Sequence, residues 1–212
     1  MNNIAVIVPT YHRARRLERV AKNIHDNTQS HTLYFVCEPG DTPSIKEIEQ
    51  LGELCIINKV PGTHTGAANT AYQETCEPFF IIANDDFNFT LGWDVAALEK
   101  MNEGFSVVGL NDCISDSFTQ ITLVRRSYIE TQSGVVDEPN TLYHSGYHHN
   151  YVDTEFAEVA MMRGVYIKCP ESRVEHKHWT KGAPMDETYK KTFSRASHDQ
   201  RLYQSRRHLW TT

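Results

Sequence analysis

Short apolar segments alternate with amphipathic segments through the first 110 residues, and this alternation restricts the fold more than any other feature. The apolar runs predict strands at residues 4–8, 33–36, 55–57, 79–83 and 106–110. Helical spacing of apolar residues predicts intervening helices at residues 14–24, 44–51, 66–75 and 91–101. Alternation of this kind is typical of βαβ units. We therefore expect an α/β fold with a mostly parallel, Rossmann-like sheet flanked by helices.

The second half of the chain has a less regular pattern. We expect a strand at 121–124, a short helix at 128–134, a helix at 152–162 and a strand at 165–168 that Pro170 ends. A last helix is expected at 187–210, with or without an interruption. The chain is therefore predicted to contain one α/β domain over residues 1–180. A basic helical tail over residues 181–212 would pack on this domain or extend from it.

Composition favours a folded cytosolic protein. The 212 residues are 40% hydrophobic, which suits one sizeable core, and no apolar run approaches the roughly 20 residues that span a bilayer. The N-terminus lacks the basic region of a secretory signal. Five scattered cysteines without CxxC spacing predict reduced core thiols and neither a disulfide framework nor a zinc site. We expect a cytoplasmic location, in the host cytoplasm if the protein is viral.

Charge is unevenly distributed along the chain. Residues 173–212 hold nine Lys and Arg against four Asp and Glu, a net of +5, whereas the whole chain carries −6. The other residues therefore carry −11. A basic tail on an acidic body predicts contact with a nucleoside diphosphate, a nucleic acid or the protein's own acidic face. For most of these charges, a solvated helix is the favoured interpretation.

Two adjacent carboxylates, Asp85 and Asp86, follow the apolar run at 79–82. Open α/β sheets bind ligands at the carboxyl ends of their strands. Two like charges side by side are costly unless a cation or donors neutralise them. Mg²⁺ and Mn²⁺ take carboxylates together with substrate phosphates, so the pair indicates a metal site for a phosphorylated substrate. A solvated turn is the alternative.

Several segments, taken in order, resemble the GT-A-fold nucleotide-sugar glycosyltransferases, and the family 2 type above all. The similarity runs from residue 4 to about residue 179. It rests on the segments IAVIVPTYHRARRL, GAANTAY, IIANDDFNFTLGW, LVRRSYIETQSGVVDE and YVDTEFAEVAMMRGVYIKCPESRVEHKHW. The resemblance implies a metal-dependent, inverting transfer of a sugar from a nucleoside diphosphate to a hydroxyl acceptor. The acceptor would be a glycan or a modified nucleic acid, as in phages.

The resemblance also implies a set of binding residues. Tyr11 would stack on the base, Arg13 would pair with phosphate, and Glu38 would accept a hydrogen bond from ribose or uracil. Asp85 would face the ribose or the donor sugar. Asp86 would bind Mn²⁺ or Mg²⁺ with His176 or His178, which alternate along an extended segment. The complete nucleotide-binding set is Pro9, Thr10, Tyr11, Arg13, Glu38, Gly66, Asn69 and Asp85.

Asp153 is the candidate catalytic base, with Glu155 as its competitor. In an inverting transfer, a carboxylate removes the proton of the acceptor hydroxyl as this oxygen attacks the anomeric carbon. The order of acidic and apolar residues in the resembling family favours Asp153. An N-cap role at the helix that begins there is the structural alternative, and the two roles are compatible.

The segment YHSGYHHNYVD before Asp153 is rich in histidine and tyrosine. Aromatic faces suit sugars and bases, so we expect residues 143–151 to form an acceptor-site loop. A zinc site is the rival, but no cysteine or acidic residue has ligand spacing there. Trp93 and Trp179 are further candidates for the sugar pocket, although either could belong to the core.

Two other functions compete with sugar transfer. A nucleotidyltransferase would need a glycine-rich phosphate loop after the first strand, and PTYHRAR has no glycine. A non-catalytic module could instead bind carbohydrate or nucleic acid through the basic tail and the loop at residues 143–151. No oligomeric state is predicted.

Overall fold

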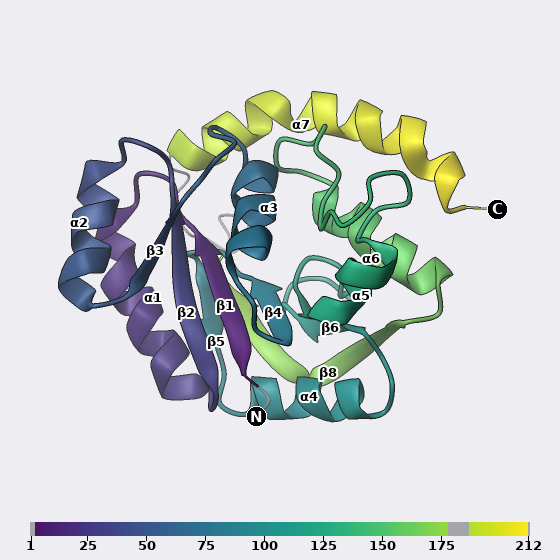
Figure 1. Ribbon diagram of the computed structural model, residues 1–212, viewed down its shortest axis with the longest axis horizontal. Helices are drawn as coiled ribbons and strands as arrows, with labels where there is room; N and C mark the ends of the chain where they lie inside the picture. Colours follow the sequence, from purple (N-terminus) through teal and green to yellow (C-terminus); the bar gives the residue numbers. More distant parts are fainter. Residues whose placement is uncertain (1–2, 178–186, 212) are drawn as a thin grey trace.

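The computed structural model describes residues 3–177 and 187–211. The described residues form a mixed eight-stranded sheet in the order β3-β2-β1-β4-β7-β6-β8-β5 (Figure 1). Its strands are β1 (Ile4–Pro9), β2 (His31–Cys37), β3 (Leu54–Ile57), β4 (Phe79–Ile82), β5 (Phe87–Phe89), β6 (Val107–Asn111), β7 (Thr122–Arg125) and β8 (Tyr166–His176). Strand β7 runs antiparallel to β4 and β6, and β5 runs antiparallel to β8, whereas the other pairs are parallel. The expected α/β class and mostly parallel order are confirmed.

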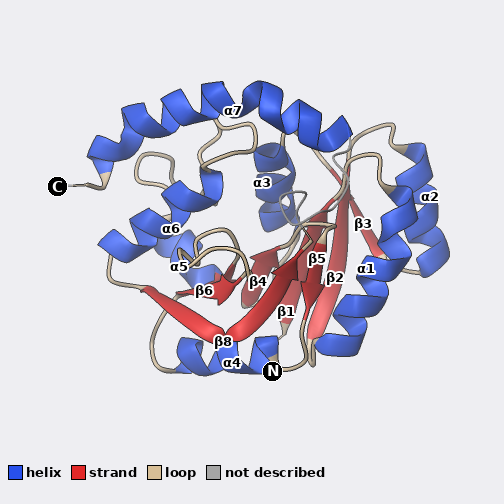
Figure 2. Ribbon diagram, turned by 180° about the vertical axis from the view of Figure 1, so that it is seen from behind, coloured by secondary structure: helices blue, strands red, loops and turns tan. Residues whose placement is uncertain are grey.

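Helices cover both faces of the sheet. They are α1 (Ala14–Asn27), α2 (Thr42–Leu51), α3 (His64–Glu74), α4 (Trp93–Asn102), α5 (Arg126–Gln132), α6 (Val152–Met162) and α7 (Glu187–Arg206), followed by a short 3-10 helix at Arg207–Leu209. Figures 1 and 2 both show α7 crossing one side of the molecule, over α3 and α6. None of the described helices combines the length and apolarity that a membrane span requires.

Alternating residues of β1 explain the two-layered core. Ile4, Val6 and Val8 pack with α1, α2 and α4 on one face. Ala5 and Ile7 pack with α3, α5 and α6 on the other. A strand buried on both faces has no polar side to display, which accounts for its uninterrupted apolar run.

Two local differences from the sequence prediction matter for the site. Strand β8 continues past Pro170 to His176, because its register with β6 shifts between Leu110 and Asn111 and Pro170 falls within this irregularity. Proline is tolerated at such a bulge, where its missing N–H breaks no ladder bond. The expected end of the strand at Pro170 was therefore wrong.

Strand β5 was not predicted from the sequence. Only three residues long, it pairs with the end of β8 and places Phe87 opposite His176. Phe87 and Phe89 are buried, so an apolar–polar–apolar triplet marks the strand. That triplet is too short to stand out against the turn residues around it. The pairing fixes the position of His176 relative to the acidic residues that precede β5.

Candidate functional site

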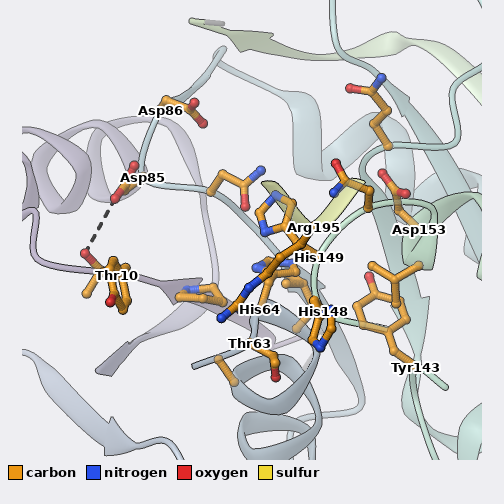
Figure 3. A pocket seen from close by; sticks show the side chains of 18 of the residues that line it. Thr10, Thr63, His64, Asp85, Asp86, Tyr143, His148, His149, Asp153 and Arg195 are labelled. Atoms are coloured by element: carbon orange, nitrogen blue, oxygen red, sulfur yellow. Dashed lines mark hydrogen bonds between the residues drawn. The ribbon is translucent and has the colours of Figure 1, made fainter. Parts of the chain in front are cut away.

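A cavity of about 500 Å³ opens at the carboxyl ends of β1, β2 and β4. Helix α7 and the loop at residues 143–151 form its opposite wall (Figure 3). Nine of the residues predicted from the sequence line this cavity: Pro9, Thr10, Tyr11, Arg13, Glu38, Asp85, Asp86, Asp153 and His176. The fold therefore gathers residues that lie up to 167 positions apart, since 176 − 9 = 167.

Asp85 is bound by arginine side chains. Arg13 Nη1 donates to Asp85 Oδ1 at 2.5 Å and Arg16 Nη1 to the same oxygen at 3.3 Å. Thr10 Oγ1 donates to Asp85 Oδ2 at 3.5 Å (Figure 3). Burial raises the pKa of Asp85, and the charge of Arg13 counteracts this shift in part. Asp85 thus links β1 and α1 to the end of β4, and Arg13, predicted to bind phosphate, already has an anionic partner.

Asp86 meets His176 through the pairing of β5 with β8. The Oδ2 of Asp86 lies 3.5 Å from Nε2 of His176, and both side chains are at most 10% exposed. The N–H of Lys177 donates to the carbonyl oxygen of Asp86 at 2.9 Å, which fixes the backbone there. One carboxylate oxygen and one imidazole nitrogen could hold a divalent metal ion, and substrate oxygens could complete the coordination. His178, the alternative ligand, lies outside the described residues.

Asp153 lies on the cavity wall in the first turn of α6. Tyr151, with φ of 64°, caps this helix, so Asp153 is not the N-cap. Its Oδ1 instead accepts from the N–H of Thr154 at 2.8 Å. Burial raises the pKa of Asp153 to about 6, and the hydrogen bonds from Thr154 and the charge of His176 oppose the shift only in part. The side chain is therefore an anion at neutral pH that binds a proton readily.

Glu155, the competing base, is committed to the protein's own structure. It is 1% exposed, and Arg206 Nη2 donates to its Oε1 at 2.8 Å. Tyr147 Oη donates to Oε2 at 2.6 Å. Arg206 also pairs with Asp137 at 2.7 Å. The positive charge of Arg206, in the basic tail, is therefore paired with the protein's own acidic groups, which are one of the three partners expected for the tail. Because Glu155 is bound in this way, the geometry favours Asp153 over Glu155 as the candidate base.

Glu38 belongs to the cavity wall but also ties two loops together. Its Oε1 accepts from Asn58 Nδ2 at 2.8 Å and its Oε2 from the N–H of Gly62 at 2.7 Å. These bonds shape the wall beside Pro9 and Tyr11. A contact of Glu38 with a nucleotide stays a prediction.

Gly66 and Asn69 do not lie among the residues that line the cavity. A Cβ at Gly66 would come within 2.3 Å of the carbonyl oxygen of Val60, so close packing explains this glycine. Asn69 bonds both backbone groups of Tyr143, donating to its oxygen at 2.8 Å and accepting from its N–H at 3.0 Å. Asn69 therefore positions the loop at 143–151. A contact of Gly66 or Asn69 with the nucleotide stays a prediction.

The loop at 143–151 reaches the cavity with only some of its aromatic residues. Tyr143, His148, His149 and Tyr151 line the cavity. His144 instead lies 3.2 Å from Glu138, and Tyr147 is buried against Glu155. Burial lowers the pKa of His149 to about 4, so its ring stays neutral. Contact of this loop with an acceptor remains a prediction.

Sequence reasoning missed His64 and Arg195, which also line the cavity. His64 packs against His149 with ring centroids 4.9 Å apart, and burial lowers its pKa to about 3. Arg195 lies on α7 and donates to the carbonyl oxygen of Gly62. The excess of Lys and Arg in the tail was the available signal for Arg195, but no pattern singled out this residue.

The tryptophans and cysteines add little to the site. Trp93 is fully buried, with its Nε1 donating to Thr28 Oγ1 at 3.0 Å, so it belongs to the core. Trp179 lies outside the described residues. All five cysteines are free thiols, and the expectation that they are core residues was wrong for Cys76, which is exposed.

No protein-family model and no curated protein sequence matches the chain. Solved structures do. The mannosyltransferase PcManGT from Pyrobaculum calidifontis, in complex with GDP-Man and Mn²⁺, superposes with a TM-score of 0.67 at 14% identity, over 82% of this chain and 56% of that one. S. aureus TarS 1-349 gives 0.65 at 10% identity, over 81% and 59%.

Glucosyl-3-phosphoglycerate synthase from Mycobacterium tuberculosis, in complex with Mn²⁺, UDP and glucosyl-3-phosphoglycerate, gives a TM-score of 0.64 at 11% identity. That match covers 91% of this chain and 76% of the synthase. The chain thus spans little more than half of the mannosyltransferase and of TarS but most of the synthase. Identities this low establish architecture, and the chain accordingly has the fold of the GT-A glycosyltransferases.

Proposed function

We propose that this protein is a metal-dependent glycosyltransferase that moves a sugar from a nucleoside diphosphate to a hydroxyl acceptor, with inversion at the anomeric carbon. The observation that carries the proposal is the meeting of Asp86 with His176, 3.5 Å apart, on the wall of a cavity that Asp153 also lines. The similarity in fold to enzymes solved with Mn²⁺ and GDP-Man or UDP supports it.

Asp86 and His176 would hold Mn²⁺ or Mg²⁺. A divalent cation there would neutralise the negative charge that collects on the leaving diphosphate. Tyr11 and Glu38, which line the cavity, would contact the nucleoside. Arg13, held in place by Asp85, would pair with the phosphates.

Asp153 would act as the base. The acceptor O–H proton moves to its carboxylate, the acceptor oxygen bonds to the anomeric carbon, and the bond from that carbon to the diphosphate oxygen breaks with its electrons on the diphosphate. A pKa of about 6 keeps Asp153 ionised at neutral pH and close to the value at which a general base is most effective.

Hydrolysis and transfer assays with UDP-sugars and GDP-mannose test the proposal. We expect turnover that requires Mn²⁺ or Mg²⁺ and that Asp86→Ala abolishes. The matched control is Asp116→Ala, which changes an acidic residue that does not line the cavity. No turnover with any donor, together with nucleic-acid or carbohydrate binding that survives Asp86→Ala, would favour a non-catalytic binding module instead.

A further inference from the structure

Asp199 of α7 is a fully buried carboxylate with an unusual set of backbone partners. Its Oδ1 accepts from the N–H of His148 at 3.0 Å. Its Oδ2 accepts from the N–H groups of His149 and Asn150 at 2.9 and 2.8 Å. Although burial acts to raise the pKa of Asp199, the hydrogen bonds from His198 and these amides lower it overall. Asp199 is therefore an anion that fixes the loop at 143–151 beneath α7.

Two imidazoles flank the same carboxylate oxygen. The Nδ1 of His198 lies 3.0 Å from Asp199 Oδ1, and the Nδ1 of His148 lies 3.5 Å from it. The two rings pack with their centroids 4.5 Å apart. The three potential ligand atoms all lie within 4.8 Å of one another. Two nitrogens and one oxygen thus converge on one point, one residue coming from the loop at 143–151 and two adjacent residues from α7.

These separations fit a small divalent cation. Zinc bonds to nitrogen and oxygen at about 2.0–2.2 Å, and tetrahedral angles then place two ligand atoms roughly 3.3–3.5 Å apart. Both measured separations from Asp199 Oδ1 lie close to this value. All three ligand atoms lie within 4.8 Å of one another, and the two histidine side chains, which are 36% and 49% exposed, can rotate to adjust this spacing. A cation would replace the Nδ1 proton of His198, and the remaining ring proton would sit on Nε2.

We propose that His148, His198 and Asp199 form a second metal site, for Zn²⁺ or a similar nitrogen-preferring cation, distinct from the site at Asp86 and His176. Figure 3 shows His148 well separated from Asp86, with His149 and His64 between them in the view. The proposal does not depend on sugar transfer. Three protein ligands leave a fourth coordination position for water or an exogenous ligand at the cavity wall, which His148 lines.

The role of this site would be to lock α7 onto the loop at 143–151. Sequence spacing argued against zinc in this loop, because no acidic partner lies nearby in the sequence. The fold supplies that partner from 51 residues away, the separation between His148 and Asp199. The loop at 143–151 leads directly into the first turn of α6, where Asp153 lies. An ion bound by His148, His198 and Asp199 would therefore restrain both α7 and the proposed base.

Metal binding by the 212-residue chain in an Asp86→Ala background tests the proposal, because this substitution removes the competing site. After treatment with EDTA and dialysis against zinc, we expect bound zinc by mass spectrometry and a rise in melting temperature. Co²⁺ substitution should give the strong visible absorption of tetrahedral cobalt. Adding His198→Ala should weaken zinc affinity more than about tenfold, since even outer partners of metal sites contribute about 10- to 100-fold.

His208→Ala is the matched control. His208 is an exposed histidine in the 3-10 helix after α7, and its Nδ1 lies 2.8 Å from the carbonyl oxygen of Ser205. We expect this variant to keep zinc affinity, cobalt absorption and the zinc-dependent rise in melting temperature. The proposal is overturned if zinc fails to bind in the Asp86→Ala background, or if His198→Ala leaves zinc affinity and cobalt absorption unchanged. Either result would make the two histidines hydrogen-bonding partners of Asp199 alone.

Discussion

Two pairs of acidic residues, Asp85 with Asp86 and Asp153 with Glu155, lie close together in the sequence and have contrasting environments in the fold. In each pair, arginine side chains bind one carboxylate: Arg13 and Arg16 bind Asp85, and Arg206 binds Glu155. The other member lies near His176, at 3.5 Å for Asp86 and within electrostatic reach for Asp153. The comparison teaches that arginine contacts distinguish, in each pair, the carboxylate bound within the protein from the one proposed to take part in the chemistry.

The largest expected effect is on catalysis. Asp153→Asn should lower the rate of sugar transfer by about 10²- to 10⁴-fold, the usual contribution of a general base. Binding of the nucleotide in the presence of Mn²⁺, measured by calorimetry, should persist. Transfer at the normal rate would show that Asp153 is not the base.

Glu155→Ala should mainly reduce stability. Removing one partner of a buried ion pair costs about 3–5 kcal/mol. Of the two acidic partners of Arg206 in the described residues, Asp137 and Glu155, only Asp137 would remain. Urea unfolding would measure this change. If Glu155→Ala were as stable as the wild type but inactive, the roles assigned to Glu155 and Asp153 would have to be exchanged.

Asp85→Asn and Asp86→Asn should differ from each other in kind. The first leaves Arg13 and Arg16 without their shared anion and should lower the free energy of unfolding by about 1–3 kcal/mol, the typical effect of losing a buried partner. The second should abolish Mn²⁺ binding, measured by electron paramagnetic resonance, with a smaller change in stability. Loss of Mn²⁺ binding in Asp85→Asn alone would contradict the comparison.

The smallest expected effect is a pH dependence of stability. The pKa of Asp153 is raised from its ordinary value of 3.8 to about 6, so the folded state binds this proton more tightly. The associated stability is present below pH 3.8 and is lost as pH rises through about 6. Asp153→Asn should therefore be more stable than the wild type at pH 8, by about 1–2 kcal/mol after allowance for partial exposure.

The difference between Asp153→Asn and the wild type should shrink as pH falls toward 4. Unfolding in urea at several pH values would measure it, with Asp116→Asn as a control for an acidic residue away from the cavity. A difference that does not change with pH would mean that the pKa of Asp153 is not raised.

Local sequence patterns predicted most of the sheet and part of the site. Buried β-branched runs identified β1 and β4, and Asp86 could be placed at the carboxyl end of β4 because an open α/β sheet binds ligands there. The helix at residues 152–162 was predicted with the bounds found. Gly66 and Asn69 were not separated from true cavity residues, because a glycine needed for packing and one needed for a ligand have the same sequence signature.

The sequence by itself determined the α/β class, because burial on both faces of a strand requires an apolar run that can be read without knowing its neighbours. Only the tertiary structure decided which partners the acidic residues have, because Arg206 meets Glu155 across 51 residues and the N–H of His148 meets Asp199 across the same separation. Electrostatic partnership depends on distance in space, and residue spacing along the chain carries no record of contacts made that far away.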